Sequence, residues 1–161
     1  MKMFTKFFVL LFVSFSLISC ATSGPKFTEL APSISKLPPD VGRIYVYRVT
    51  SFGALFQPDV KLNGEVVGKS TPKGFFYIDR KPGTYEILTS TEVDRKLSLT
   101  LEKGQTRYVR LNVSMGFFAA HIYPELVDSE TAESEIQDCH FIGQENKLSL
   151  SKINMESGQS N

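Results

Sequence analysis

The side chains best suited to nucleophilic or metal chemistry are two cysteines, Cys20 and Cys139, and two histidines, His121 and His140. A metal centre or a catalytic triad needs several such groups that converge on one point. Cys139 and His140 are adjacent, and neighbouring residues on a helix diverge by about 100°. The sequence also lacks the G-x-S-x-G, H-E-x-x-H, phosphate-loop and dinucleotide fingerprints. It therefore predicts no catalytic residue, no metal and no cofactor.

Two weaker enzymatic alternatives remain. His121 lies in a strand-like segment, and a serine could join it with Asp79 or Glu125 in a hydrolytic triad, although sequence supplies no geometry for that assembly. A cell-wall or glycan hydrolase would need two carboxylates about 5 to 10 Å apart in a cleft. Candidates for such a pair cluster near one turn, at Glu86, Glu92 and Asp94. Clusters of this kind more often form a solvated face, so a non-enzymatic protein is the leading prediction.

Cys20 has the clearest chemical context. It follows Leu17-Ile18-Ser19, at the end of an apolar run over 7–18 that Lys2 and Lys6 precede. A short positive region and an apolar run too short to span a membrane are typical of an export signal. The last four residues resemble a bacterial lipobox, in which the cysteine thiolate takes a diacylglycerol chain as a thioether. The alternatives are an uncleaved anchor helix, or a plain signal peptide with an incidental Cys20.

Lipidation would fix the compartment. Cleavage before Cys20 frees an amine that takes a third chain in many bacteria, and at about 0.8 kcal/mol per buried CH₂ two or three chains form a lasting anchor. Gram-negative lipoproteins retained in the inner membrane tend to have aspartate after the cysteine, whereas this chain has Ala21. For a Gram-negative source the resemblance implies the outer membrane, facing the periplasm. With Cys20 acylated, Cys139 is either a buried free thiol or one half of an intermolecular disulfide.

Changes in composition along the sequence divide the chain into four predicted regions. Residues 1–19 form the cleaved signal, and 20–40, rich in Ser, Pro and Thr, form the lipidated cysteine and a flexible tether. Residues 41–143 form the folded domain. Residues 144–161 form a polar tail, predicted to be disordered, in which 147–153 alternate well enough for a last edge strand.

The folded domain has the pattern of β structure. Residues 43–49 (RIYVYRV) are apolar on both faces, as in a central strand, while 83–89, 95–102 and 106–113 alternate apolar and polar residues. Asn63-Gly64 is a type I′ hairpin signal, and Pro82-Gly83 and Lys103-Gly104 mark two more reversals. We expect an antiparallel β-sandwich of about seven to eight strands.

One short amphipathic helix is predicted after the strands. Asp128 or Ser129 can cap it, and Ala132, Ile136 and Cys139 share one face at i, i+4 and i+7. We expect this face to cover the sheet and the helix to end near Gly143.

The segments GRIYVYRV, VKLNGEVVGKS, GFFYID, KPGTYEI, LEKGQTRYVRLNV and AESEIQDC together resemble a family of short bacterial lipoproteins classed as a domain of unknown function. The central part, 58–87, is also similar to PEGA-type and carboxypeptidase-regulatory-like β-domains, which have a V-x-L-N-G hairpin before a P-G-x-Y strand. The resemblance implies a transthyretin- or PEGA-like sandwich and an envelope compartment, but no chemistry.

Two apolar loops are the candidate partner-binding residues. SFGALFQP, 51–58, contains Phe52, Leu55 and Phe56, and SMGFF, 114–118, contains Met115 and Phe117. Loops rarely bury such side chains fully, so they form either end caps of the core or a recognition patch for an envelope protein, peptidoglycan or the lipid surface.

The charge balance of the chain indicates which classes of partner are expected. The chain has 18 basic and 17 acidic residues, and without residues 1–19 the balance is 16 to 17, a formal charge of −1. Because no basic excess exists, nucleic acid is not an expected partner. The predicted function is a membrane-anchored envelope lipoprotein with a non-enzymatic binding or accessory module. The alternative is a periplasmic inhibitor or chaperone-like factor that uses a sheet edge or the Phe loops.

Overall fold

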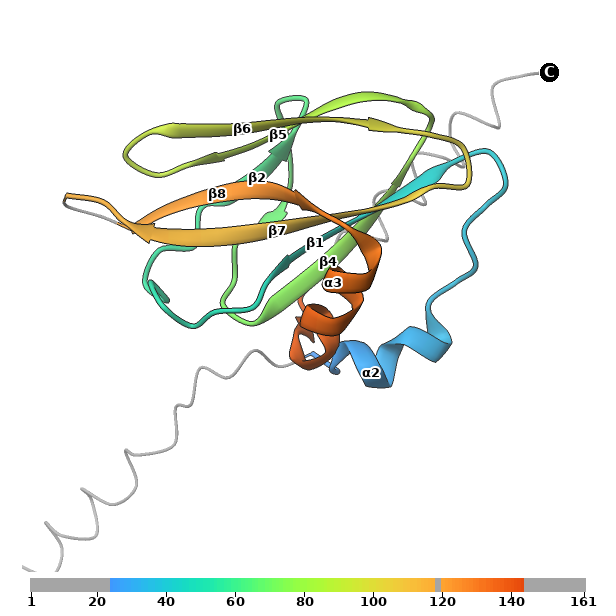
Figure 1. Ribbon diagram of the computed structural model, residues 1–161, viewed down its shortest axis with the longest axis horizontal. Coiled ribbons are helices and arrows are strands. Elements are labelled where there is room, and N and C mark those ends of the chain that lie inside the picture. Colours follow the sequence, from blue (N-terminus) through green and yellow to red (C-terminus); the bar gives the residue numbers. More distant parts are fainter. Residues whose placement is uncertain (1–23, 118–119, 144–161) are drawn as a thin grey trace, which may run out of the picture.

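Two β-sheets face each other, and helices cover the outer side of one of them (Figure 1). The computed structural model describes residues 24–117 and 120–143. Within these residues, the first sheet has the strand order β8-β7-β1-β4-β9 and the second has the order β3-β2-β5-β6. The strands are β1 (Gly42–Arg48), β2 (Asp59–Leu62), β3 (Glu65–Lys69), β4 (Gly74–Arg80), β5 (Gly83–Ser90), β6 (Asp94–Leu101), β7 (Thr106–Met115), β8 (Ala120–Val127) and β9 (His140–Phe141). The predicted β-sandwich is confirmed.

β1 is the central strand of the five-stranded sheet. Every residue from Gly42 to Arg48 is buried. Ile44 and Val46 pack between the sheets, whereas Tyr45 and Tyr47 pack under the helices. The prediction that both faces of this strand are covered is therefore confirmed. β1 pairs antiparallel with β4 but parallel with β7, a pairing that alternation alone does not predict.

The three predicted reversals have different roles. Asn63 (φ 49°) and Gly64 (φ 87°) join β2 to β3, and positive φ at both residues is the type I′ geometry predicted for this hairpin. Pro82-Gly83 and Lys103-Gly104, in contrast, carry the chain from one sheet to the other, from β4 to β5 and from β6 to β7. These crossovers close the sandwich rather than extend one sheet.

The core between the sheets is mostly aliphatic. It contains Ile44, Val46, Val60, Leu62, Val67, Phe76, Ile78, Ile87, Leu99, Leu101, Val109, Leu111 and Ile122. These positions include the inward residues of the alternating segments, and each aliphatic side chain contributes about 1.5 to 3 kcal/mol when fully buried.

A second cluster, largely aromatic, lies on the outer face of the five-stranded sheet. Tyr45 stacks on Tyr108 with ring centroids 5.2 Å apart. The hydroxyl of Tyr47 donates to Glu135, and that of Tyr108 donates to Glu133. Both acceptors lie on α3 (Ser129–Glu135), so these bonds hold the helix against the sheet while the rings stay buried.

The C-terminal helix is present but shorter than predicted. Asp128 caps it by accepting from the backbone N–H of Thr131 at 2.9 Å. The helix tightens into the 3₁₀ turn η2 (Ile136–Asp138), and Ala132, Ile136 and Cys139 are all buried. The chain then extends into β9, parallel to β4, so the predicted helix end near Gly143 is wrong. His140 and Phe141 pair with β4 and therefore form a short strand instead of further helical turns.

Residues 24–34, which the sequence places in the tether, pack against the sheet. The segment forms α2 (Phe27–Leu30) and the 3₁₀ turn η1 (Ala31–Ser33). The ring of Phe27 lies 5.3 Å from that of Phe75, and the backbone N–H of Phe27 donates to the carbonyl of Cys139. Burial of Phe27, Leu30 and Ile34 against the aromatic cluster explains why this segment follows the domain surface.

The predicted signal over 1–19, Cys20 with its lipid, and the polar tail over 144–161 lie outside the described residues.

Candidate interaction site

Three connections gather at one end of the sandwich, here called the loop end: 49–58 between β1 and β2, 90–93 between β5 and β6, and 114–117 at the tip of β7 (Figure 1). Two contacts join the end of β5 and the β5–β6 turn to β8. The hydroxyl of Thr89 donates to the carbonyl of Ile122 at 2.6 Å, and His121 Nε2 lies 2.9 Å from the Glu92 carboxylate. Segments far apart in sequence thus form one surface.

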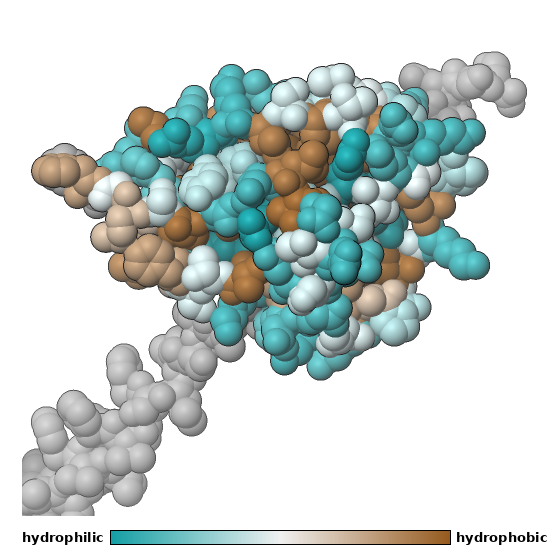
Figure 2. Space-filling view, viewed as in Figure 1, coloured by the Kyte–Doolittle hydropathy of each residue, from teal (hydrophilic) through white to brown (hydrophobic). Residues whose placement is uncertain are grey.

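Four of the five predicted partner-binding residues are exposed at this end. The exposed fractions are 52% for Phe52, 95% for Leu55, 75% for Met115 and 88% for Phe117. Phe56 differs, because it is half-buried against the core between the sheets. Figure 2 shows apolar residues protruding at the end where the β7–β8 hairpin and the 49–58 loop lie. The end-cap interpretation therefore holds for Phe56 alone.

Arg48 fixes the shape of the 49–58 loop from beneath. Its guanidinium is fully buried and donates to the carbonyls of Phe52 (2.6 Å), Phe56 (2.9 Å) and Ser70 (2.8 Å). Burial lowers the pKa of Arg48, because desolvation disfavours the charged form. Hydrogen bonds to three carbonyls offset part of this cost and tie the loop to the end of β1, while Arg48 Nε has no hydrogen-bond partner among the described residues. Sequence analysis missed this residue.

Gly53 brings the two aromatic loops together. Its φ of +67° favours glycine, and a Cβ at this position would lie 3.1 Å from both Ala120 Cβ and Val113 Cγ1. The 49–58 loop therefore packs directly on the β7–β8 hairpin. The two loops, predicted separately from the sequence, form one apolar surface.

A shallow hollow of about 410 Å³ lies between the 49–58 loop and the β5–β6 turn. Its lining combines Leu55, Phe56, Gln57 and Pro58 with Ser90, Thr91 and Glu92. The Thr91 hydroxyl is buried here and has no hydrogen-bond partner among the described residues. The polar residues that line this hollow therefore lie beside the exposed apolar side chains of the 49–58 loop.

The imagined catalytic triad is not assembled. His121 faces Glu92, whereas Asp79 binds the buried Arg43 and Glu125 accepts from Arg110. Two of the three predicted carboxylates, Glu86 and Asp94, lie far apart on the β5–β6 ladder. Glu86 pairs with Ser98, while Asp94 pairs with Ser90 at the far end of the same ladder, about 13 Å along the strand. The pairing expected of a glycosidase is not formed between these two.

Cys139 and His140 point to different partners. Cys139 is buried, and its thiol donates weakly to the carbonyl of Arg48 at 3.8 Å. Burial raises the pKa of Cys139 to about 11. His140 Nδ1 lies 2.7 Å from the carbonyl oxygen of Gly24. Among residues 24–117 and 120–143, no group of three or more His, Cys, Asp and Glu side chains could hold a metal ion.

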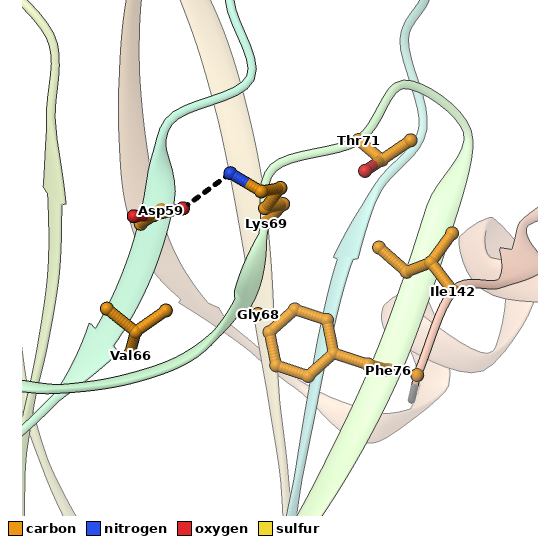
Figure 3. Close-up of a pocket in the computed structure, with 8 residues that line it drawn as sticks. Asp59, Val66, Gly68, Lys69, Thr71, Phe76 and Ile142 are labelled. Carbon is orange, nitrogen blue, oxygen red and sulfur yellow. Dashed lines mark hydrogen bonds and ion pairs between the residues drawn. The ribbon is translucent and has the colours of Figure 1, made fainter. Parts of the chain in front are cut away.

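A second hollow, of about 320 Å³, lies beside the edge strand β3 (Figure 3). Phe76 and Ile142 line it, and the Lys69–Asp59 ion pair (2.7 Å) lies at its border. Gly68 is required there, because a Cβ would come within 2.6 Å of the Phe76 ring. This hollow could accept a small apolar group beside the strand edge.

These features define a β-sandwich domain with an apolar loop end on a framework fixed by a buried arginine. The chain belongs to the family described as "Protein of unknown function (DUF2846)", whose model matches residues 39–123. It is also similar to an uncharacterized protein of Haemophilus influenzae, with 27% identity over 113 residues, or 70% of this chain and 59% of the relative. The match thus spans less than two thirds of that relative's length. In the part of the chain that the structure describes, no helix has the length and apolar character needed to cross a bilayer.

Proposed function

We propose that this protein is an envelope lipoprotein, anchored through acyl chains on Cys20, whose β-sandwich is a non-enzymatic binding or accessory module. The observation that carries the module's role is the loop end, where Phe52, Leu55, Met115 and Phe117 are exposed together. Contiguous exposed apolar side chains mark interaction surfaces more often than reaction centres. The rigid support from Arg48 favours a surface kept in a fixed shape for contact.

The lipid anchor is supported by the sequence Leu17-Ile18-Ser19-Cys20 after the apolar run over 7–18. Ala21 favours the outer membrane, facing the periplasm, in a Gram-negative cell. The likeness of 58–87 to PEGA-type domains also fits an extracytoplasmic module, because the Asn63-Gly64 hairpin precedes β5 as that pattern implies.

The test is the intact mass and membrane fractionation of the wild type beside Cys20→Ser, both expressed in the native host. We expect the wild type to carry a mass increment of two or three acyl chains and to enter the membrane fraction, and Cys20→Ser to be uncleaved and unmodified. A soluble, unmodified wild type would refute the anchor. Hydrolysis of purified peptidoglycan by the wild type would refute the non-enzymatic role.

The hollow beside β3 favours a second candidate, an inhibitor or chaperone-like factor that adds a partner strand to this edge. The exposed Val66 and the Phe76 floor would receive alternate side chains of that strand. Val66→Lys would then abolish a stoichiometric complex that Leu55→Ser leaves intact, as size-exclusion chromatography would show. The reverse pattern would exclude the edge as the binding surface.

A further inference from the structure

The loop end differs from the opposite end of the sandwich in charge as well as in hydropathy. Residues 49–58 contain no ionisable side chain, and 111–124 contain His121 and Tyr123 but no Asp, Glu, Lys or Arg. The third connection, 90–93, adds Glu92, which lies 2.9 Å from His121. The opposite end, at the two crossovers between the sheets, carries Arg80, Lys81, Glu102 and Lys103. A surface that enters the boundary between lipid headgroups and acyl chains must present apolar and aromatic side chains and few charges.

The chain leaves the domain close to the membrane anchor. The carbonyl oxygens of Gly24 and Pro25 are tied to β9, by His140 Nδ1 at 2.7 Å and by the backbone N–H of Phe141 at 2.8 Å. Only 21–23 lie between this attachment and Cys20, and four residues span at most about 14 Å. A link this short cannot hold the domain far from the bilayer, so part of its surface must lie against the lipid.

The strand register places the loop tips within reach of that same bilayer. Phe141 pairs with Phe75, and Phe75 pairs with Tyr47, so Gly24 lies near the level of Tyr47. Arg110 of β7 is also at this level, and Met115 is five residues further along, about 17 Å towards the loop end. This height is close to the reach of the link, so the tips and the acyl chains can meet one surface together.

From these observations we infer that the loop end docks on the membrane leaflet that holds the acyl chains of Cys20, with Leu55, Phe117 and their apolar neighbours entering the interfacial region. This inference rests on the proposed lipid anchor. It assigns the exposed tips to lipid and fixes the orientation of the domain, because the 49–58 loop and the β7–β8 hairpin are rigidly joined through Gly53. The charged end and the crossovers then face away from the bilayer.

The absence of tryptophan from the sequence permits a direct test. Leu55→Trp and Phe117→Trp each place one fluorescent reporter at the loop end, and Val66→Trp is a matched control on β3, where the native side chain is 47% exposed. Each full-length lipidated variant is reconstituted into phosphatidylethanolamine–phosphatidylglycerol vesicles that contain nitroxide-labelled lipid. Circular dichroism checks the fold, and intact mass checks the acyl chains on the same samples.

We expect lipid nitroxide to quench the reporters at 55 and 117 at least about twofold more than the reporter at 66, with the opposite order for aqueous iodide. Equal quenching at all three positions in lipidated, vesicle-bound protein would overturn the docking and leave the lipoprotein proposal intact. Shielding of 55 and 117 from iodide only after envelope extract is added would assign the loop end to a protein partner, which also overturns the docking. Protein that lacks the acyl mass increment would refute the anchor itself.

Discussion

The guanidinium of Arg48 donates a 2.6 Å hydrogen bond to the carbonyl oxygen of Phe52 and thereby joins the buried end of β1 to the backbone of an exposed aromatic residue. The same group holds Phe56 and Ser70. A buried charge bonded to three carbonyls is costly to remove, since each of these acceptors then loses its donor. The shape of the loop end thus depends on one residue beneath it.

Arg48→Met is expected to lower the free energy of unfolding by about 3 kcal/mol and to loosen the 49–58 loop. Urea denaturation measures the first effect, and limited proteolysis with mapping of the cleavage sites measures the second. The exposed Arg95 provides the matched control, since Arg95→Met should change stability by no more than about 0.5 kcal/mol. Equal behaviour of the two variants would show that Arg48 does not organise the loop.

Phe27→Ala tests whether residues 24–34 belong to the folded domain. Its ring packs edge-on against Tyr45 (5.9 Å) and Phe75 (5.3 Å), so truncation should cost about 2 kcal/mol. Lys36→Ala, at an exposed position further along the chain, should have no measurable effect. Thermal unfolding compares them. An unchanged midpoint for Phe27→Ala would return the segment to the tether and lengthen the link to Cys20.

The fold could be predicted where a feature depends on residues that are close together in the sequence. The doubly apolar β1, the Asn63-Gly64 turn and the Asp128 cap depend on neighbouring residues, and the structure confirms all three. The parallel pairing of β1 with β7 depends on two crossovers distant in sequence, and alternation carries no information about it. Phe27, Leu30 and Ile34 had the i, i+3, i+7 spacing of a covering helix, but the segment's short length and its Pro and Ser content favoured a tether.

The candidate site was predictable in part. Sequence identified the apolar loop residues but left open whether they cap the core, and the structure divides them, with Phe56 inward and Leu55 outward. Their partner stays a prediction. Arg48 offered one signal that was not used: a cation at the end of a strand apolar on both faces must either reach solvent or find buried acceptors.

The Arg43–Asp79 pair is expected to show strong coupling. Arg43 Nε and Nη2 donate to the two carboxylate oxygens at 2.6 and 2.8 Å, and Nη1 reaches the carbonyl of Ser35 at 3.0 Å. Asp79→Leu alone should cost about 3 to 5 kcal/mol, since it leaves a buried cation unpaired. The double variant Arg43→Met/Asp79→Leu should cost less than the sum of the single variants, as a double-mutant cycle in urea would show. Simple additivity would mean that the pair contributes no specific interaction.

Cys139 is expected to be chemically inert in the folded protein. Burial raises its pKa from 9.0 to about 11, so the reactive thiolate is scarce at neutral pH. In the Cys20→Ser variant Cys139 is the sole thiol, and a thiol-specific disulfide reagent at about pH 8 should label it only after unfolding in urea.

The raised pKa of Cys139 also makes the stability of the protein depend on pH. The unfolded thiol ionises first, so the contribution of Cys139 to stability is complete below pH 9.0 and declines as the pH rises towards 11. Cys139→Ala should remove this alkaline component, which urea titrations on both sides of that interval would detect. Rapid labelling of the native variant would instead show that Cys139 is accessible, and a dimer that reductant dissociates would show that it forms an intermolecular disulfide.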